Sequence, residues 1–118
     1  LRLIEDPAEK AAACCRLVRR LTGFDRVMVY RLHEDAHGEV IAEDRDEPLE
    51  PYLGLHYPAS DTPPQARRLY LESRTRIIPD VDYEPVPLLG PPHAASADIG
   101  RSGLRSVSPY HLTYLRNM

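Results

Sequence analysis

The sequence predicts an α+β fold, an antiparallel sheet flanked by helices. Its 118 residues suffice for one hydrophobic core. Apolar residues recur at helical spacing near both ends, and two short runs of β-branched and aromatic residues lie between them. The resulting order is helix, hairpin, loop, helix, strand, loop, helix, which is typical of an α+β domain.

The first helix begins with a set of capping residues. Asp6 precedes Pro7 at the first helical position, and Glu9 follows three residues after Asp6. Apolar residues then recur at helical spacing as far as Leu21, and Gly23 ends the helix.

Two strands are expected next. Residues 24–32 include Val27, Val29 and Tyr30, which favour extended structure, and residues 39–43 form the second run. The segment between them, from His33 to Gly38, is polar and typical of a turn. The two runs therefore predict a hairpin.

Proline dominates the middle of the chain, since ten of the twelve prolines fall between positions 48 and 92. Residues 44–60 and 80–103 are expected to be loops, and so long a second loop usually has a functional reason. The run Thr62-Pro63-Pro64-Gln65 predicts a capped helix that continues to about Ser73. Residues 76–78 predict a short strand that Pro79 stops.

A third helix is expected at the end of the chain. Ser108 is suited to cap it and Pro109 to occupy its first position. One face of this helix carries residues spaced i, i+3, i+4 and i+7, namely His111, Tyr114, Leu115 and Met118.

Composition excludes several classes of protein. The net charge of −3 gives no attraction for nucleic acid, and no apolar run is long enough to span a membrane. The start of the chain lacks the apolar core of a signal peptide, so we expect a cytoplasmic protein. Cys14 and Cys15 are adjacent on a helix, which disfavours a disulfide scaffold or a cysteine-based zinc site.

Several polar residues have two possible interpretations. His111 is either a core histidine with one hydrogen bond or a contact to a ligand in a pocket. Asp61 is either an ordinary helix-start acid or a residue whose backbone must be aimed. Three arginines are either surface charges or partners for an anionic ligand, namely Arg74, Arg76 and Arg105.

Other features give weaker signals. Seven tyrosines against one phenylalanine would suit a pocket for a flat, partly polar ligand, but also a wet core. His33 and His37 have the i, i+4 spacing of metal ligands, with Asp35 between them. They lie in a predicted turn rather than on a helix, so we interpret this segment as solvated. Motifs for hydrolases, phosphate-binding loops and zinc proteases are absent from the sequence.

Three blocks of the sequence resemble the chromophore-binding GAF domain of phytochromes, most closely the bacterial, biliverdin-binding branch. The resemblance covers nearly all of residues 1–118, and its densest parts are LTGFDRVMVYRLHEDAHGEVIAED at 21–44, YLGLHYPASDTPPQARRLY at 52–70 and LRSVSPYHLTYLRNM at 104–118. It implies a linear tetrapyrrole, biliverdin or a related bilin, held between the sheet and the helices.

The resemblance also implies roles for individual residues. Asp61, followed by Pro63, would accept hydrogen bonds from pyrrole nitrogens through its backbone carbonyl, and His111 would lie beside the pyrrole rings. The remaining positions would form the aromatic walls and the contacts to the propionates, namely Tyr30, Tyr57, Tyr70, Arg76, Arg105 and Ser108. Light would isomerise the bilin, so the resemblance implies a sensor rather than an enzyme.

The sequence departs from the family pattern at two sites. Thr62 replaces the usual isoleucine, and Tyr110 stands where plant and many cyanobacterial members carry the cysteine that links the bilin. We therefore expect no covalent attachment in this chain. The family's last strands and C-terminal helix would follow Met118, so the GAF domain is expected to be truncated.

The resemblance further implies neighbouring PAS and PHY domains, a histidine kinase output and a homodimer in the parent protein. Two other functions remain open at this point. One is a GAF module without pigment that binds another small molecule or mediates dimerisation. The other is an enzyme that uses His111 and Asp61 as an acid–base pair.

Overall fold

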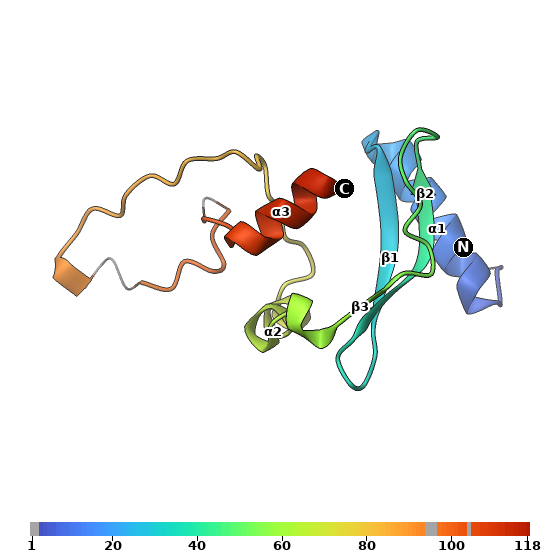
Figure 1. The fold of residues 1–118 in the computed structure, drawn as a ribbon, viewed down its shortest axis with the longest axis horizontal. Coiled ribbons are helices and arrows are strands. Elements are labelled where there is room, and N and C mark those ends of the chain that lie inside the picture. The colour runs from blue at the N-terminus through green and yellow to red at the C-terminus, as the bar shows by residue number, and fades with distance from the viewer. Residues whose placement is uncertain (1–2, 94–96, 104) are drawn as a thin grey trace. The chain divides into compact units, whose positions relative to one another are not determined.

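The chain forms two compact units, which are described separately. A computed structural model describes residues 3–93, 97–103 and 105–118. The N-terminal unit is Leu1–Pro63 and the C-terminal unit is Pro64–Met118 (Figure 1). The first contains a helix and the whole sheet, and the second contains two short helices.

Helix α1 (Pro7–Thr22) begins and ends where the sequence predicts. The Asp6 carboxylate accepts a hydrogen bond from the Glu9 backbone N–H at 3.0 Å, which satisfies a donor that the helix itself leaves open. Gly23 adopts a φ of 73°, and its N–H donates to the Arg19 carbonyl at 2.8 Å. This left-handed conformation is easy for glycine and explains the end of the helix.

The sheet has three strands in the order β1-β2-β3. Strand β1 (Arg26–Leu32) and strand β2 (Gly38–Arg45) form the predicted antiparallel hairpin. Strand β3 (His56–Tyr57) lies within a segment predicted to be loop, and pairs antiparallel with the start of β2. Val29 pairs with Ala42 but Tyr30 pairs with Val40, so β2 has a one-residue bulge at Ile41.

The core of the described residues is small and belongs to the N-terminal unit. Cys15 of α1 and Val40 and Ala42 of β2 are its buried apolar side chains. Figure 1 shows α1 packed beside the β1–β2 hairpin. Burial raises the pKa of the Cys15 thiol, so this cysteine behaves as a packing residue.

In the C-terminal unit, α2 (Pro64–Glu72) begins one residue later than the predicted first position, Pro63. The helix α3 (Pro109–Asn117) begins as predicted, since the Ser108 hydroxyl accepts a hydrogen bond from the His111 backbone N–H at 3.3 Å. The described residues between 80 and 103 contain no α-helix or strand, in agreement with the long predicted loop.

The strand predicted at residues 76–78 is wrong. These residues are irregular, and the third strand of the sheet comes from His56 and Tyr57 instead. The Arg76 side chain donates to the Gly100 carbonyl at 3.1 Å, so this segment is fixed by a side chain rather than by a strand ladder. Pro79 follows and has no N–H to offer a neighbouring strand.

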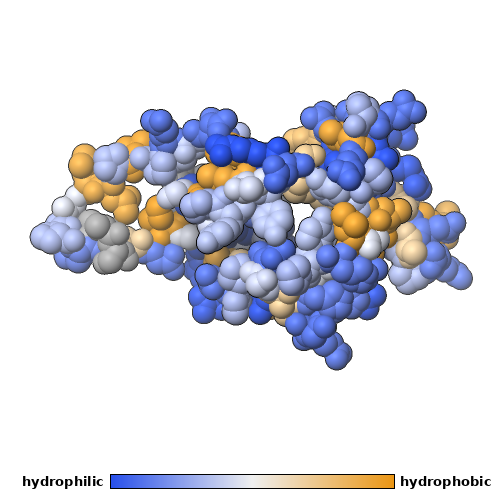
Figure 2. All heavy atoms as spheres, viewed as in Figure 1, coloured by the Kyte–Doolittle hydropathy of each residue, from blue (hydrophilic) through white to orange (hydrophobic). Residues whose placement is uncertain are grey.

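Apolar side chains remain on the surface of both units. Within the described part of Pro64–Met118 no residue is buried, and Leu71, Val86 and Leu89 are among the most exposed apolar residues. Figure 2 shows scattered apolar patches among hydrophilic residues on the viewed face. Among the described residues, no helix is long and apolar enough to cross a membrane.

Candidate ligand-binding site

Two of the predicted tyrosines meet on the sheet. The ring centroids of Tyr30 on β1 and Tyr57 on β3 lie 6.0 Å apart with the rings tilted by 48°. Gly38 of β2 makes this possible, because a Cβ atom there would overlap the Tyr30 ring and hydroxyl. A glycine in this strand thus lets an aromatic ring lie close against the backbone.

Asp61 lies a few residues after β3 in the sequence. The short 3-10 helix η1 (Ala59–Asp61) connects β3 to the end of the N-terminal unit, and the Asp61 N–H donates to the Pro58 carbonyl at 3.0 Å. The Ser60 hydroxyl donates to the Asp61 carboxylate at 3.3 Å. Partial burial, then the nearby Tyr52 and more weakly the negative charge of Asp61, raise the pKa of Tyr57 above its ordinary value of 10.0. Tyr57 and Asp61 are therefore close enough to interact electrostatically.

A buried carboxylate organises the loop that leads to β3. Glu43 pairs with Arg26, and their side chains are only 4% and 8% exposed. The same carboxylate accepts hydrogen bonds from the backbone N–H groups of Tyr52 at 2.9 Å and Leu53 at 3.2 Å. The Arg26 guanidinium also lies 4.0 Å above the centre of the Tyr52 ring. Glu43 and Arg26 were not predicted as site residues, since their pairing depends on strand register that local spacing does not reveal.

Arg76 and Arg105, which are distant in the sequence, line one hollow in the C-terminal unit. Its volume is about 610 Å³, and Arg101 lines it as well. Arg76 is oriented by its bond to Gly100, and the Arg105 guanidinium donates to the Ser102 carbonyl at 2.8 Å. Arg101 instead pairs with Glu72 at 2.7 Å. Guanidinium groups in such a hollow suit a ligand with carboxylates.

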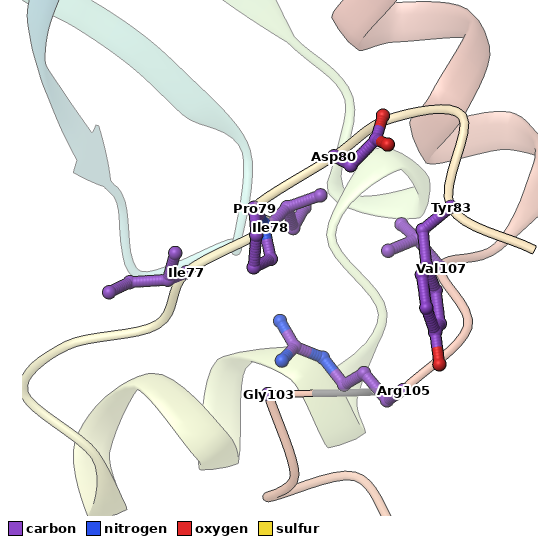
Figure 3. Close-up of a pocket in the computed structure, with 8 residues that line it drawn as sticks. All are labelled: Ile77, Ile78, Pro79, Asp80, Tyr83, Gly103, Arg105 and Val107. Carbon is purple, nitrogen blue, oxygen red and sulfur yellow. The ribbon is translucent and has the colours of Figure 1, made fainter. Parts of the chain in front are cut away.

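Arg105 also borders a smaller cavity of about 60 Å³ (Figure 3). The figure shows its guanidinium extending toward the segment that contains Ile77 and Pro79, with the Tyr83 ring beside Val107. Arg105 thus belongs to the lining of both hollows, whereas Arg74 lines neither and is exposed on the surface.

His111 is exposed on α3 and is not the core histidine that the sequence left open. Partial loss of water around the ring, and then the positive charge of Arg105, lower the pKa of His111 below its ordinary value of 6.5. The neutral imidazole is therefore favoured near neutral pH. Ser108 caps the same helix through its hydroxyl, which places three predicted site residues in one region, namely Arg105, Ser108 and His111.

Tyr70 and Pro63 join no cluster among the predicted site residues. Tyr70 lies on α2 with 51% of its surface exposed. Pro63 is also exposed, directly before the first residue of α2.

The turn between β1 and β2 is half-buried to exposed at residues 33–37, and it contains a cluster of rings that was not predicted. The rings of His33 and His37 are stacked with centroids 4.2 Å apart, and the ring of His56 on β3 lies 5.3 Å from that of His37. Two acids contact these rings. Glu39 lies 2.8 Å from His33 Nε2, and Asp35 lies 2.5 Å from His37 Nδ1. Within the described ranges, no group of three or more such side chains is arranged to hold a metal ion.

Comparison of the chain with known proteins shows which family it belongs to, although no family model matches the chain. A bacteriophytochrome of Xanthomonas campestris is 52% identical over 124 residues, a match that covers 100% of this chain and 20% of the relative. A bacteriophytochrome of Pseudomonas aeruginosa is 56% identical over 104 residues, covering 86% of this chain and 14% of the relative.

Solved structures agree. The chromophore-binding domain of Stigmatella aurantiaca phytochrome P1 matches with a TM-score of 0.81 and 50% identity, covering 99% of this chain and 39% of that one. The chain belongs to the chromophore-binding domains of bacteriophytochromes. The same domain of an unusual bacteriophytochrome from R. palustris gives a TM-score of 0.84 at 44% identity, over 97% of this chain and 39% of that one.

This membership confirms the resemblance and the predicted GAF-type α+β fold. The chain spans a fifth or less of the length of the bacteriophytochromes it matches among the curated relatives.

Proposed function

We propose that the chain binds a linear tetrapyrrole, biliverdin or a close relative, as the photosensory part of a bacteriophytochrome that responds to red and far-red light. The observation that carries this proposal is the match to solved chromophore-binding domains over 97–99% of the chain at 44–50% identity. The proposal includes no reaction on a substrate by these residues.

The residues present fit such a pigment. A linear tetrapyrrole carries two propionate carboxylates on a flat conjugated frame. Arg76 and Arg105 line one hollow, and planar guanidinium groups pair well with carboxylates. Tyr30 and Tyr57 offer ring faces with hydroxyls at their edges, which suits a flat ligand with polar groups.

Each unit would contribute its own contacts. In the C-terminal unit, Arg76 and Arg105 would bind the propionates, with the Ser108 hydroxyl near one of them. In the N-terminal unit, Tyr30 and Tyr57 would form walls, and the Asp61 backbone carbonyl would accept hydrogen bonds from pyrrole N–H groups. Tyr70 would add a further aromatic contact, and Pro63 would restrict the backbone after Asp61.

The pigment, when bound, supplies light absorption and the isomerisation of one double bond. The chain supplies the groups that respond to that change. His111 is held as a neutral imidazole near neutral pH by partial desolvation and by Arg105, so it can accept a hydrogen bond as well as donate one. Asp61 and Tyr57, which interact electrostatically, would exchange hydrogen-bond partners in response.

A signal would then pass to other domains of the parent protein. We propose PAS and PHY neighbours, a histidine kinase as output and a homodimeric parent. Because Tyr110 on α3 stands where plant and many cyanobacterial members carry the linking cysteine, attachment of the pigment to these residues is proposed to be non-covalent.

The test is addition of biliverdin to the chain, with an absorption spectrum recorded before and after red illumination. We expect a sharpened red band that light reduces. The variant Arg76→Gln should weaken pigment binding about tenfold or more, the scale of one charge-assisted hydrogen bond. Arg74→Gln is the matched control, because Arg74 is exposed and lines neither hollow. Absence of both the band and its response to light would refute the proposal.

A further inference from the structure

The turn formed by residues 98–102 lies beside the hollow of the C-terminal unit that Arg76 and Arg105 line, and both arginines donate hydrogen bonds to its backbone. We propose that this turn, which Asp98 closes, is a positioning element that fixes the two guanidinium groups for the two carboxylates of the pigment. The inference rests on the proposed function. Asp98 acts in it through the arginines, as a positioning residue.

The turn is closed by two hydrogen bonds of its own. The Ser102 N–H donates to the Ile99 carbonyl at 2.8 Å, which is the i to i+3 bond of a β-turn. The Asp98 carboxylate accepts the Gly100 N–H at 2.9 Å, two residues further along the chain. Aspartate fixes many turns in this way, because its short side chain reaches the backbone two residues on. Asp98 therefore holds the residue at the centre of the turn.

Gly100 and Ser102 each present a carbonyl to one arginine. The Arg76 guanidinium donates to the Gly100 carbonyl at 3.1 Å, and the Arg105 guanidinium donates to the Ser102 carbonyl at 2.8 Å, both in partly buried surroundings. Within the part of the chain that the structure describes, neither arginine forms an ion pair with an acid. Each guanidinium has five N–H donors, so a bond to one carbonyl orients the group and leaves donors for a carboxylate.

The charges that line the hollow match a ligand with two carboxylates. Arg101, at the centre of the turn, pairs with Glu72 at 2.7 Å, and Glu72 is the last residue of α2. Glu72 is also the acidic residue among those that line the hollow. Since it neutralises Arg101, two positive charges remain for the ligand, those of Arg76 and Arg105. A linear tetrapyrrole brings two propionates.

Fixing an arginine in advance strengthens the binding of a carboxylate. The side chain has many rotamers, and a ligand that must restrict them binds more weakly. Without the Asp98 contact the turn would lose its fixed geometry, and with it the places of the two carbonyls. The affinity for the pigment should then fall about fivefold, the scale of one ordinary hydrogen bond. A pigment without free carboxylates gains nothing from the arrangement.

The test compares biliverdin with its dimethyl ester, in which both propionates are blocked. Absorption titrations give the dissociation constant of each for Asp98→Ala and Asp98→Asn. Both changes remove the charge, but asparagine keeps an oxygen that can accept the Gly100 N–H. The constant for biliverdin should be about fivefold higher in Asp98→Ala than in Asp98→Asn, and the constants for the ester should be equal.

Asp35→Ala is the matched control. The Asp35 carboxylate makes the same kind of contact in the N-terminal unit, where it accepts the His37 backbone N–H at 3.2 Å. Its removal should leave the ratio between the two pigments unchanged, because that turn holds neither Arg76 nor Arg105.

A measurement on the pigment-free chain separates this inference from the proposed function. Nitrogen-15 relaxation of the arginine Nε–H groups reports how firmly each guanidinium is held. Arg76 and Arg105 should be more ordered than the exposed Arg74, and they should lose this order in Asp98→Ala but keep it in Asp98→Asn.

Three results would each overturn the inference. They are equal order of the arginines in the two Asp98 variants, equal affinity of these variants for biliverdin, and an equal loss of affinity for biliverdin and for its ester. If the unmodified chain binds no pigment while the relaxation changes as expected, the proposed function fails but the hold of the turn on the arginines is supported.

Discussion

Replacement of Glu43 by glutamine should destabilise the N-terminal unit far more than its modest change in size suggests. The Glu43 and Arg26 side chains are 4% and 8% exposed, so the guanidinium would remain buried after its countercharge is lost. Removing one partner of a buried ion pair costs about 3–5 kcal/mol. Glutamine keeps one oxygen that can accept hydrogen bonds from the Tyr52 and Leu53 amides. We therefore expect Glu43→Gln to lower the free energy of unfolding by about 3 kcal/mol, the lower end of this range.

Asp46→Asn is the matched control. Asp46 also pairs with an arginine, Arg19, in the same unit, but its side chain is 47% exposed. Exposed pairs contribute about 0–1 kcal/mol, so this change from acid to amide should cost less than 1 kcal/mol.

The assay is urea unfolding followed by far-ultraviolet circular dichroism, with the exchange of the Asp46 amide reporting on the N-terminal unit. A double variant that replaces Arg26 by Met and Glu43 by Leu removes both charges, and should recover most of the stability lost in Glu43→Gln. Equal costs for Glu43→Gln and Asp46→Asn would refute the reasoning, because burial would then have no effect on the pair.

Three further predictions follow from the site. Gly38→Ala should cost about 1–3 kcal/mol in urea unfolding, because the new Cβ displaces the Tyr30 ring, and the cost should largely disappear in a Tyr30→Ala background. His111 should titrate below 6.5 by NMR, and Arg105→Gln should raise its pKa. Because the pKa of His111 is lower in the folded chain, the unfolded chain binds more protons just below pH 6.5. The free energy of unfolding should therefore decrease as the pH drops below 6.5. Biliverdin bound to the chain should separate from it in denaturant, and pigment that stays attached would point to Cys14 or Cys15.

The sequence predicted most accurately the elements whose ends are determined locally. Asp6, Gly23 and Ser108 each act through residues three or four positions away, so their effect is visible in a short window of sequence. The hairpin was equally accessible, because alternating β-branched residues and a polar turn lie next to each other. The family resemblance, confirmed by the comparisons, came from three longer blocks read together.

Features that depend on pairing between distant residues were missed. Strand β3 is only two residues long, and it forms because it pairs with the edge of β2. Residues 76–78 have better strand propensity, but they are held by the hydrogen bond of the Arg76 side chain instead. The i, i+4 spacing of His33 and His37 was interpreted only in terms of a helix face. Two residues that close a hairpin turn also lie side by side, and His33 and His37 do so here. The meeting of Arg76 and Arg105 at one hollow likewise has no local signal.

The bulge at Ile41 divides the hairpin into two parts with different registers. From Arg26 to Val29 the numbers of the paired residues have one constant sum, and from Tyr30 to Leu32 that sum is smaller by one. Side chains alternate between the faces of a strand, so this single extra residue determines which of them share the face of Tyr30. Deletion of Ile41 would make Val40 and Ala42 adjacent on β2, so these two buried side chains would have to point to opposite faces of the strand.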